Sequence, residues 1–367
     1  MANLSQVNNI SLQFQKYFTK NLRMNDFNLL IINWYRQNKR NLPWRLTKDP
    51  YKIWLSEIIL QQTKVDQGLN YYVKFCNNYP TIQDLANAEE QQVLTDWQGL
   101  GYYSRARNLH TTAKTILNTY NGTFPNTYDN ILKLKGVGSY TAAAISSFAF
   151  DLPHAVVDGN VYRVLSRLYD LDTPIDSSEG IKQFNYLANE LLNKKHPAEH
   201  NQAIMEFGAL QCTPTNPNCT SCPLAQTCLA QKKGTISQRP VKKSKTKVRN
   251  RYLHFLHIET EDQIIITQRT EKDIWQNMFQ FPLIEKTSLE ELSLVQAEIE
   301  RTYNIKISDV KSNIKHILSH QHLYTTFWKT NTIPEKIRSD KAYFIIPKEA
   351  LTSYPIPRVI DRYLEEN

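Results

Sequence analysis

Four of the five cysteines in this 367-residue chain fall within seventeen residues, as Cys212-x6-Cys219-x2-Cys222-x5-Cys228. The sequence that carries them, CTPTNPNCTSCPLAQTC, is rich in Pro, Asn and Thr and predicts a loop. Four thiolates so close in sequence can surround one metal centre and tie that loop down. This layout suits a metal centre in a reducing compartment better than a disulfide framework, since Cys76 stands far apart.

The spacing of the four cysteines favours a [4Fe-4S] cluster. Zinc sites with four cysteines usually pair two short knuckles across a longer gap, whereas these cysteines form one run with unequal short steps. Zinc is the second interpretation, and a loop without metal the third. A cluster here need not be redox-active, because it could serve a structural role by holding a loop whose flanking lysines contact phosphates.

The length of the chain predicts two domains. Apolar residues recur at helical spacing in FNLLIINWY, IWLSEIILQQ and YTAAAISSFAF, which predicts an all-α domain over residues 26–230. A stretch rich in Lys and Arg, residues 231–250, has the composition of a linker. Short β-type runs such as QIIITQR and HLYTTFWKT, with the helical run SLEELSLVQAEIERTY, predict an α+β domain over 251–367. Residues 1–25 are expected to be a polar N-terminal appendage.

The net charge of +9 and the pI near 9.1 indicate an acidic partner, with nucleic acid first among them, because Lys and Arg side chains neutralise phosphates. A basic balance that only keeps the protein soluble is the alternative. The chain has neither an apolar run of membrane-spanning length nor a secretory signal at its start. We therefore expect a cytoplasmic protein, associated with the nucleoid in a bacterium.

The segment LKLKGVGSYTAAAI predicts two helices joined by the turn Gly136-Val137-Gly138, a helix-hairpin-helix. Glycines permit positive φ and leave the N–H groups of the turn uncovered. Such N–H groups at a helix N-terminus bind phosphate without regard to base sequence. An ordinary turn between two helices, with Gly for geometry alone, is the alternative.

Two carboxylates have surroundings that suit acid and anion chemistry. Asp158 precedes the helical run in VVDGNVYRVLSRL, where it would cap free N–H groups and be held strongly acidic by them. Glu57 lies in the apolar run IWLSEIILQQT, where burial would raise its pKa and make it a proton donor. Each also has a plainer interpretation: Asp158 as a cap only, and Glu57 on the wet face of its helix.

These motifs together resemble the endonuclease III superfamily of DNA glycosylases, and within it the adenine DNA glycosylase family (MutY type). The resemblance covers most of the chain through LPWR, YKIWLSEIILQQTKV, GLGYYSRARNLH, VVDGNVYRVL and NQAIMEFGALQC. It implies an all-α helix-hairpin-helix glycosylase domain with a [4Fe-4S] loop. It also implies a Nudix-like domain that recognises 8-oxoguanine opposite the adenine, for which residues 251–350 have the right appearance.

The resemblance assigns roles to four residues of the catalytic site. Glu57 would protonate N7 of adenine, Asp158 would stabilise the sugar cation, and Asn160 would orient Asp158 by a hydrogen bond. Tyr140 stands where relatives with lyase activity carry a Schiff-base lysine, and a phenol cannot form that imine. The chemistry implied is hydrolysis that leaves an abasic site.

Further residues match the family's positions around the flipped base. The adenine pocket would be formed by Trp44, Arg45, Leu60 and Gln202, although core packing would also explain Trp44 and Leu60. Gln62 and Tyr102 would push into the base stack beside the extruded nucleotide, or else lie on the surface of a helix and a loop.

In the second domain the run ILSHQH places Ser319 and His320 where the family has its Phe-Ser-His loop, which contacts 8-oxoguanine. Leu318 replaces the usual Phe, and DIWQNMFQFP lacks glycines often found in the matching stretch. The Nudix catalytic box is absent from residues 282–304, so we expect no nucleotide pyrophosphohydrolase activity.

The sequence thus predicts a monofunctional adenine DNA glycosylase of base excision repair that acts as a monomer on double-stranded DNA. Its substrate would be adenine mispaired with 8-oxoguanine or guanine. One alternative is a bifunctional glycosylase and lyase for oxidised pyrimidines, against which Tyr140 argues. The other is a non-catalytic protein that binds damaged DNA, against which the presence of both Glu57 and Asp158 argues.

Overall fold

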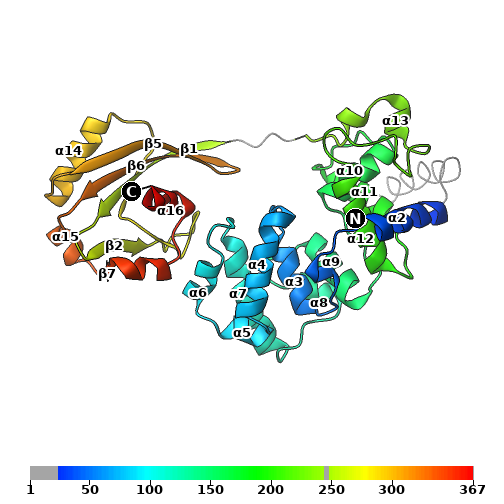
Figure 1. The fold of residues 1–367 in the computed structure, drawn as a ribbon, viewed down its shortest axis with the longest axis horizontal. Coiled ribbons are helices and arrows are strands. Elements are labelled where there is room, and N and C mark those ends of the chain that lie inside the picture. The colour runs from blue at the N-terminus through cyan, green and yellow to red at the C-terminus, as the bar shows by residue number, and fades with distance from the viewer. Residues whose placement is uncertain (1–23, 244–247, 367) are drawn as a thin grey trace. The chain divides into compact units, whose positions relative to one another are not determined.

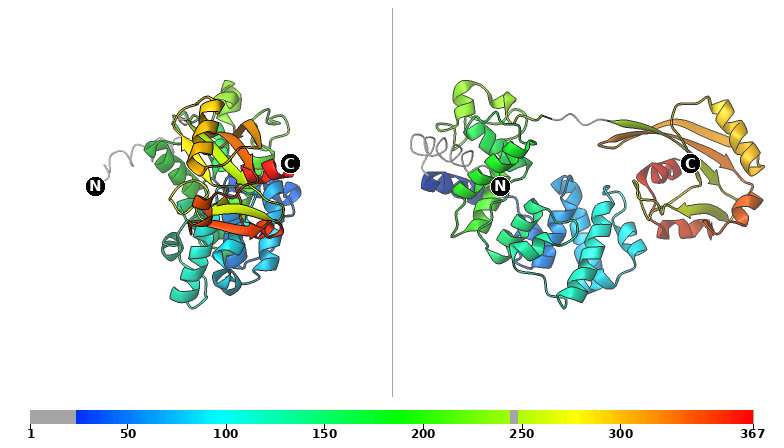
Figure 2. Two further views of the ribbon diagram at one scale, coloured as in Figure 1. Left: turned by 90° about the vertical axis from the view of Figure 1, so that its left-hand side faces the viewer. Right: turned by 180° about the vertical axis from the view of Figure 1, so that it is seen from behind.

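The computed structural model describes residues 24–243 and 248–366 and divides into two compact units (Figures 1 and 2). One unit contains the described residues up to Gln62 and those from Thr115 to Lys243. The other contains residues 63–114 and 248–366. Most of the expected N-terminal appendage, residues 1–23, lies outside the described residues. Within the described ranges no helix is both long enough and apolar enough to cross a membrane.

The part of the chain before the second domain is helical, as predicted, and its described residues contain no strand. In the first unit the helices are α2 (Met24–Asn38), η1 (Pro43–Arg45), α3 (Pro50–Ile59), α8 (Tyr128–Leu132), α9 (Ser139–Phe150), α10 (Gly159–Leu168), α11 (Ser178–Leu191), α12 (Pro197–Leu210), α13 (Leu229–Lys233) and η2 (Ile236–Gln238). The other helices that precede the second domain are α4 (Val65–Asn78), α5 (Ile82–Asn87), α6 (Glu90–Asp96) and α7 (Ser104–Thr119), and α7 crosses into the first unit.

The core of the first unit joins α2, α10, α11 and α12. Helix α10 buries Val161, Val164, Leu165 and Leu168, the i, i+3, i+4, i+7 spacing that places apolar residues on one face of a helix. These side chains form one cluster with apolar residues of the other three helices and with residues of the cysteine loop. The loop is therefore anchored in the same core that holds the start of α10.

A close approach between α12 and the start of α10 requires glycine at position 208. A Cβ atom there would lie 2.7 Å from Cβ of Asn160 and 2.8 Å from its carbonyl oxygen. Both distances are shorter than side chains normally allow, so a larger residue would push the two helices apart. Gly208 thereby fixes how near α12 comes to the residues that follow Asp158.

The expected linker, residues 231–250, begins inside α13 and contains η2. Beyond η2, the carbonyl of Val241 accepts a hydrogen bond from the N–H of Ile175 (3.0 Å), and the N–H of Lys243 donates to Asp176 (2.8 Å). The backbone up to Lys243 is thus hydrogen-bonded to the first unit, and regular structure resumes where β1 begins at Arg249.

The second domain is α+β, as predicted. Its elements are β1 (Arg249–Ile258), β2 (Gln263–Gln268), β3 (Phe279–Gln280), β4 (Leu283–Lys286), α14 (Leu292–Tyr303), β5 (Asp309–Ile317), β6 (Gln321–Thr330), α15 (Glu335–Arg338), β7 (Tyr343–Pro347), η3 (Lys348–Ser353) and α16 (Arg358–Glu365). One sheet has the order β4-β1-β6-β5, with β1 parallel to β6 and the other pairs antiparallel; the second has the order β3-β2-β7.

Successive side chains of β1 and β6 point to opposite faces of the larger sheet, and apolar residues are buried on both faces. Phe255 pairs with Phe327 in the register of the two strands, and the Phe327 ring stacks on Tyr363 of α16 with the ring centres 3.9 Å apart. The next pair, Leu256 and Trp328, belongs to a cluster with apolar residues of α14. Helices α14 and α16 therefore cover opposite faces of the sheet, and the β5–β6 turn lies at its edge (Figure 1).

We predict that Gly208→Ala destabilises the protein by about 1–3 kcal/mol, because overpacking against Asn160 outweighs the better helix propensity of Ala. The free energy of unfolding from urea titration measures the change. Gly159→Ala is the matched control, since a Cβ at that helical position meets no atom within 4 Å. Equal stability of the two variants would contradict the close approach.

Candidate active site and cysteine loop

Glu57 is buried in the second half of α3, with 8% of its surface exposed. Pro50 and the Asp49 cap start this helix, and α3 then packs against α9, which leaves residues 53–59 without a wet face. Burial raises the pKa of Glu57 to about 7, while a hydrogen bond from the Tyr140 phenol opposes the shift. The expectation of a buried carboxyl with a raised pKa is confirmed.

Asp158 caps α10, as predicted. Its Oδ1 accepts from the N–H of Val161 and its Oδ2 from the side-chain amide of Asn160, both at 2.7 Å. The expectation that these bonds make it strongly acidic is wrong: desolvation raises the pKa of Asp158, although the hydrogen bonds lower it. Although the residue as a whole is half-buried, its carboxyl group is removed from water, and this outweighs the hydrogen bonds from Val161 and Asn160 and the charge of Arg163.

Tyr140, in the first turn of α9, connects the two carboxyl groups. Its phenol hydrogen-bonds to Glu57, and its pKa lies well above 10 because the ring is desolvated and faces the charges of Glu57 and Asp158. The phenol therefore stays protonated and acts as a donor. Glu57, Tyr140 and Asp158, predicted from three separate segments, lie close enough to interact electrostatically.

The hairpin between α8 and α9 has the geometry of a backbone anion site. Gly136 has a φ of +80°, the left-handed conformation that glycine adopts without strain. Val137 is buried, whereas Gly136 and Gly138 are exposed. Gly138 is the N-cap of α9, and no side chain caps this helix end, so its first N–H groups are available to a phosphate.

The predicted pocket residue Arg45 is held by an acid that the sequence analysis did not single out. The guanidinium of Arg45 makes two hydrogen bonds to the Glu206 carboxylate, at 2.7 and 2.9 Å. Arg40 donates to the same carboxylate, and together the two arginines hold the pKa of Glu206 near 2 despite its burial. Arg45 also lowers the pKa of Glu57 electrostatically, so this network borders the acid.

The other predicted base contacts differ in exposure. Trp44 is buried, whereas Leu60 at the end of α3 and Gln202 on α12 are half-buried. The Gln202 carbonyl accepts from the Tyr35 hydroxyl at 3.3 Å. Gln62 and Tyr102 are exposed, and both have positive φ (55° and 49°), a conformation that is uncommon outside glycine and gathers at functional sites.

Arg163 joins the carboxylate site to the cysteine loop. Its guanidinium donates to the Asn160 side-chain oxygen (2.7 Å) and to the carbonyl of Cys212 (2.7 Å), and also to the carbonyl of Gly208. Asn160 in turn holds Asp158. A continuous set of hydrogen bonds therefore runs from the helix cap to the first cysteine.

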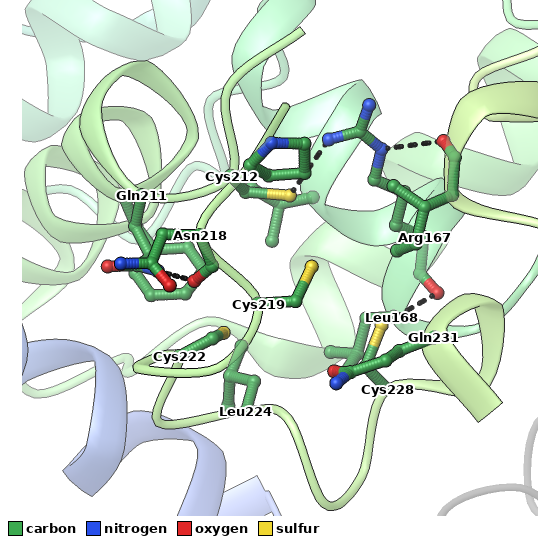
Figure 3. A pocket seen from close by; sticks show the side chains of 14 residues that line it. Arg167, Leu168, Gln211, Cys212, Asn218, Cys219, Cys222, Leu224, Cys228 and Gln231 are labelled. Carbon is green, nitrogen blue, oxygen red and sulfur yellow. Dashed lines mark hydrogen bonds between the residues drawn. The ribbon is translucent and has the colours of Figure 1, made fainter. Parts of the chain in front are cut away.

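The four cysteines line one pocket at the end of the helical core, and their sulfur atoms face a common space (Figure 3). All are free thiols, and burial raises the pKa of Cys222 to about 11. In the described part of the chain no three His, Cys, Asp or Glu residues are arranged to hold one metal ion. The four thiols that line the pocket are the residues that could hold a metal centre.

In the second unit Ser319 and His320 are exposed in the turn between β5 and β6. The Ser319 hydroxyl hydrogen-bonds to the Tyr102 hydroxyl. The two side chains border a cavity of about 420 Å³, which Trp275 and Leu318 also line. Two residues predicted from separate runs of sequence thus meet at one site.

Sequence reasoning missed Glu206, Arg163 and Arg167 as site residues. A signal existed: each is a charged residue inside an otherwise apolar helical run, the criterion that had selected Glu57. All three are buried or half-buried. Glu206 pairs with an arginine, whereas Arg163 and Arg167 donate hydrogen bonds to neutral oxygens.

Comparison with known proteins bears out both domains. The family model for HhH-GPD superfamily base excision DNA repair proteins matches residues 55–188, and the NUDIX domain model matches residues 254–366. A solved thermostable thymine-DNA glycosylase superposes with a TM-score of 0.54 at 30% identity, covering 57% of this chain and 97% of that one. A trapped endonuclease III–DNA covalent intermediate shares the fold, with a TM-score of 0.50 at 23% identity, covering 58% of this chain and 99% of that one.

Curated relatives extend the match across most of the chain. The adenine DNA glycosylase of Buchnera aphidicola (subspecies Baizongia pistaciae) is 38% identical over 299 residues, 80% of this chain and 83% of that protein. The human adenine DNA glycosylase is 42% identical over 212 residues, 55% of this chain and 39% of that protein. With a helical glycosylase domain, a Nudix-like domain and a relative 38% identical over 83% of its length, the chain belongs to the adenine DNA glycosylase family of base excision repair enzymes.

Proposed function

We propose that this enzyme hydrolyses the N-glycosidic bond of adenine mispaired with 8-oxoguanine or guanine in double-stranded DNA, leaving an abasic site. One observation carries the proposal: Glu57 is buried, has a pKa of about 7 and accepts a hydrogen bond from Tyr140 beside Asp158. A carboxyl of this pKa is about half protonated at neutral pH, the condition in which an acid donates a proton most effectively.

Each step follows from the residues present. The Glu57 proton goes to N7 of adenine, the bond from C1′ to N9 breaks, and its electron pair leaves with the base. Asp158 faces the sugar cation that remains, with its oxygens held by Val161 and Asn160. Water then bonds to C1′ and gives up a proton to the Glu57 carboxylate, which restores the acid. This division of work between two carboxyl groups parallels that of glycosidases.

Tyr140 supports hydrolysis over the lyase alternative. The residue is an uncharged phenol with a pKa well above its usual value, and it donates to Glu57. It has no amine with which to form a Schiff base, so β-elimination has no nucleophile at this position. Its part in our proposal is to hold the Glu57 carboxyl in place.

The remaining contacts support DNA binding and base flipping. The uncapped start of α9 would bind a backbone phosphate through its N–H groups. Trp44, Arg45, Leu60 and Gln202 would surround the flipped adenine, and Gln62 and Tyr102 would fill the base stack. The monomeric state and the cytoplasmic, nucleoid-associated location expected from the sequence stay predictions.

We also propose that the four cysteines hold a [4Fe-4S] cluster. The support is the common space that their sulfurs face, together with the spacing of the four cysteines in one run of unequal short steps. When bound, the cluster would supply a compact anionic centre that fixes the loop. The chain's own contribution is the apolar packing of Leu224 and Cys228 in the core and the hydrogen bond from Arg163 to Cys212.

Removing either carboxylate should stop base release without releasing the DNA. We expect Glu57→Gln and Asp158→Asn to lower the single-turnover excision rate by about 10²- to 10⁴-fold, with affinity for the duplex nearly unchanged. The wild-type rate should fall as pH rises through about 7, because Glu57 loses its proton. The matched control is Glu190→Gln, an exposed residue of α11.

Two results would contradict this mechanism. If Glu57→Gln excised adenine at the wild-type rate, Glu57 would be excluded as the proton donor. Covalent capture of DNA on the wild-type enzyme by borohydride would show an imine and favour the bifunctional alternative.

The raised pKa of Glu57 also has a cost in stability. The folded state keeps a proton that the unfolded chain releases between about pH 4.5 and 7, so wild-type stability falls as pH rises through that window. Each pH unit in this window changes the free energy of unfolding by about 1.4 kcal/mol. The free energy of unfolding of Glu57→Gln should therefore exceed that of wild type by about 3 kcal/mol at pH 8 and by less than about 1 kcal/mol at pH 5. Urea titrations at both pH values, with Glu190→Gln alongside, test it. A constant difference between wild type and Glu57→Gln would show that Glu57 is not desolvated.

Preference for the opposite base should depend on Ser319 and His320. We expect faster excision of adenine opposite 8-oxoguanine than opposite guanine or thymine. Ser319→Ala should reduce that preference by about 2- to 10-fold, the value of one hydrogen bond. Ser293→Ala, at an exposed position of α14, is the control. If the wild-type enzyme excised adenine at equal rates opposite 8-oxoguanine, guanine and thymine, the lesion-recognition role of the second domain would be refuted. The excision mechanism would be unaffected.

A further inference from the structure

Arg167 is a fully buried cation beside the cysteine pocket. It lies in the last turn of α10 with 2% of its surface exposed, and it is one of the largest completely buried side chains in the described residues. Burying a guanidinium is costly unless its N–H groups and its charge both find partners. All the hydrogen-bond acceptors of the Arg167 guanidinium lie in or next to the cysteine loop.

The N–H groups of Arg167 are satisfied by backbone carbonyls. Nε donates to the carbonyls of Ile236 (3.1 Å) and Arg239 (3.3 Å), Nη1 to Thr213 (2.7 Å), and Nη2 to Pro214 (3.0 Å). Two of these carbonyls follow Cys212 directly and the other two follow α13. Arg167 thus ties the beginning of the cysteine loop to the segment after its end.

The same residue touches two cysteines. Nη1 lies 3.5 Å from Sγ of Cys212 in hydrogen-bonding geometry, and the backbone carbonyl of Arg167 accepts from Sγ of Cys228 at 3.4 Å (Figure 3). Arg167 therefore contacts the first and the last of the four cysteines. Its guanidinium points at the sulfur from outside the space that the four sulfurs face.

The charge of Arg167 has no carboxylate partner among the described residues. Asp170, one turn further along the chain, is already paired with Arg239 and Lys233. Arg163, on the same helix, also interacts electrostatically with Arg167 and Cys212, but it is a second cation and does not balance the charge of Arg167. Among the contacts of the guanidinium in the described residues, the Cys212 sulfur is the one that would become anionic, on binding a metal.

We propose that Arg167 is the buried counter-ion of the cysteine centre, acting on it through its charge and through the hydrogen bond to Cys212 Sγ. A cluster with four thiolates is anionic, and each electron added makes it more so. A nearby cation and a hydrogen bond to sulfur therefore favour the reduced form and raise the reduction potential. Arg167 is a positioning residue that makes the centre harder to oxidise, and so helps to retain it.

This inference rests on the [4Fe-4S] cluster proposed above, and the test separates the two. Wild type, Arg167→Lys and Arg167→Gln are purified as full-length holoproteins. The first readout is absorption near 400 nm with iron content. The second is the midpoint potential of the one-electron oxidation, measured by voltammetry. The third is the rate at which the 400 nm band decays in excess ferricyanide, which serves as the oxidant.

We expect the midpoint potential to fall in the order wild type, Arg167→Lys, Arg167→Gln, and the ferricyanide decay to quicken severalfold in the same order. Lysine keeps the charge but cannot reach all the carbonyls and the sulfur at once. Lys232→Gln is the matched control: it removes one positive charge at an exposed position of α13, where solvent screens it, and should leave both readouts unchanged.

Wild-type protein without iron or a 400 nm band would refute the cluster and say nothing against the excision chemistry. Iron-loaded variants with the wild-type potential and decay rate would refute the role of Arg167 and leave the cluster standing. If Arg167→Gln does not fold, Arg167→Lys decides alone, and an unchanged potential and decay rate in that variant overturns the proposal.

Discussion

Removal of Glu57 from water is the constraint on which the active site depends. Helix α3 packs against α9 with apolar residues on every side, so the one carboxyl in its second half has no solvent to stabilise its charge. The Tyr140 phenol and the nearby Arg45 recover only part of that loss. The result is a group whose proton is neither tightly held nor absent at neutral pH. An acid for a poor leaving group such as adenine needs that balance.

Helix α10 connects the candidate active site to the cysteine loop. Its cap is Asp158, its second turn bears Arg163, and its last turn bears Arg167. The two arginines are four residues apart and reach the cysteine loop from neighbouring positions, one at the Cys212 carbonyl and the other at the Cys212 sulfur. A single short helix therefore has the proposed catalytic carboxylate at one end and the cysteine loop at the other.

Sequence patterns predicted the helices and the two domains and drew attention to Glu57 and Asp158, because apolar spacing and helix caps are local properties. Tyr140 and Asn160 were predicted only through the family resemblance. Those patterns left the exposure of Glu57 undecided because α3 is buried all round, and a helix without a wet face has no period to detect. They gave the wrong direction for the Asp158 pKa, since desolvation depends on distant segments. They missed β5, whose sequence DVKSNIKHI mixes charges with apolar residues and whose register shifts partway along.

The pairing of α2 with α12 has a consequence for how the chain is made. Asn28 hydrogen-bonds to the carbonyl of Leu191, 163 residues later, and Arg36 pairs with Glu199 at the same separation. At a synthesis rate of about 5–20 residues per second, α2 would wait on the order of 10–30 s for these partners to be added. During that time the apolar side chains of Phe27 and Ile31 have none of their final neighbours from α12. The apolar side chains that α2 buries against α12 thus stay without these partners until the end of the helical domain has been made.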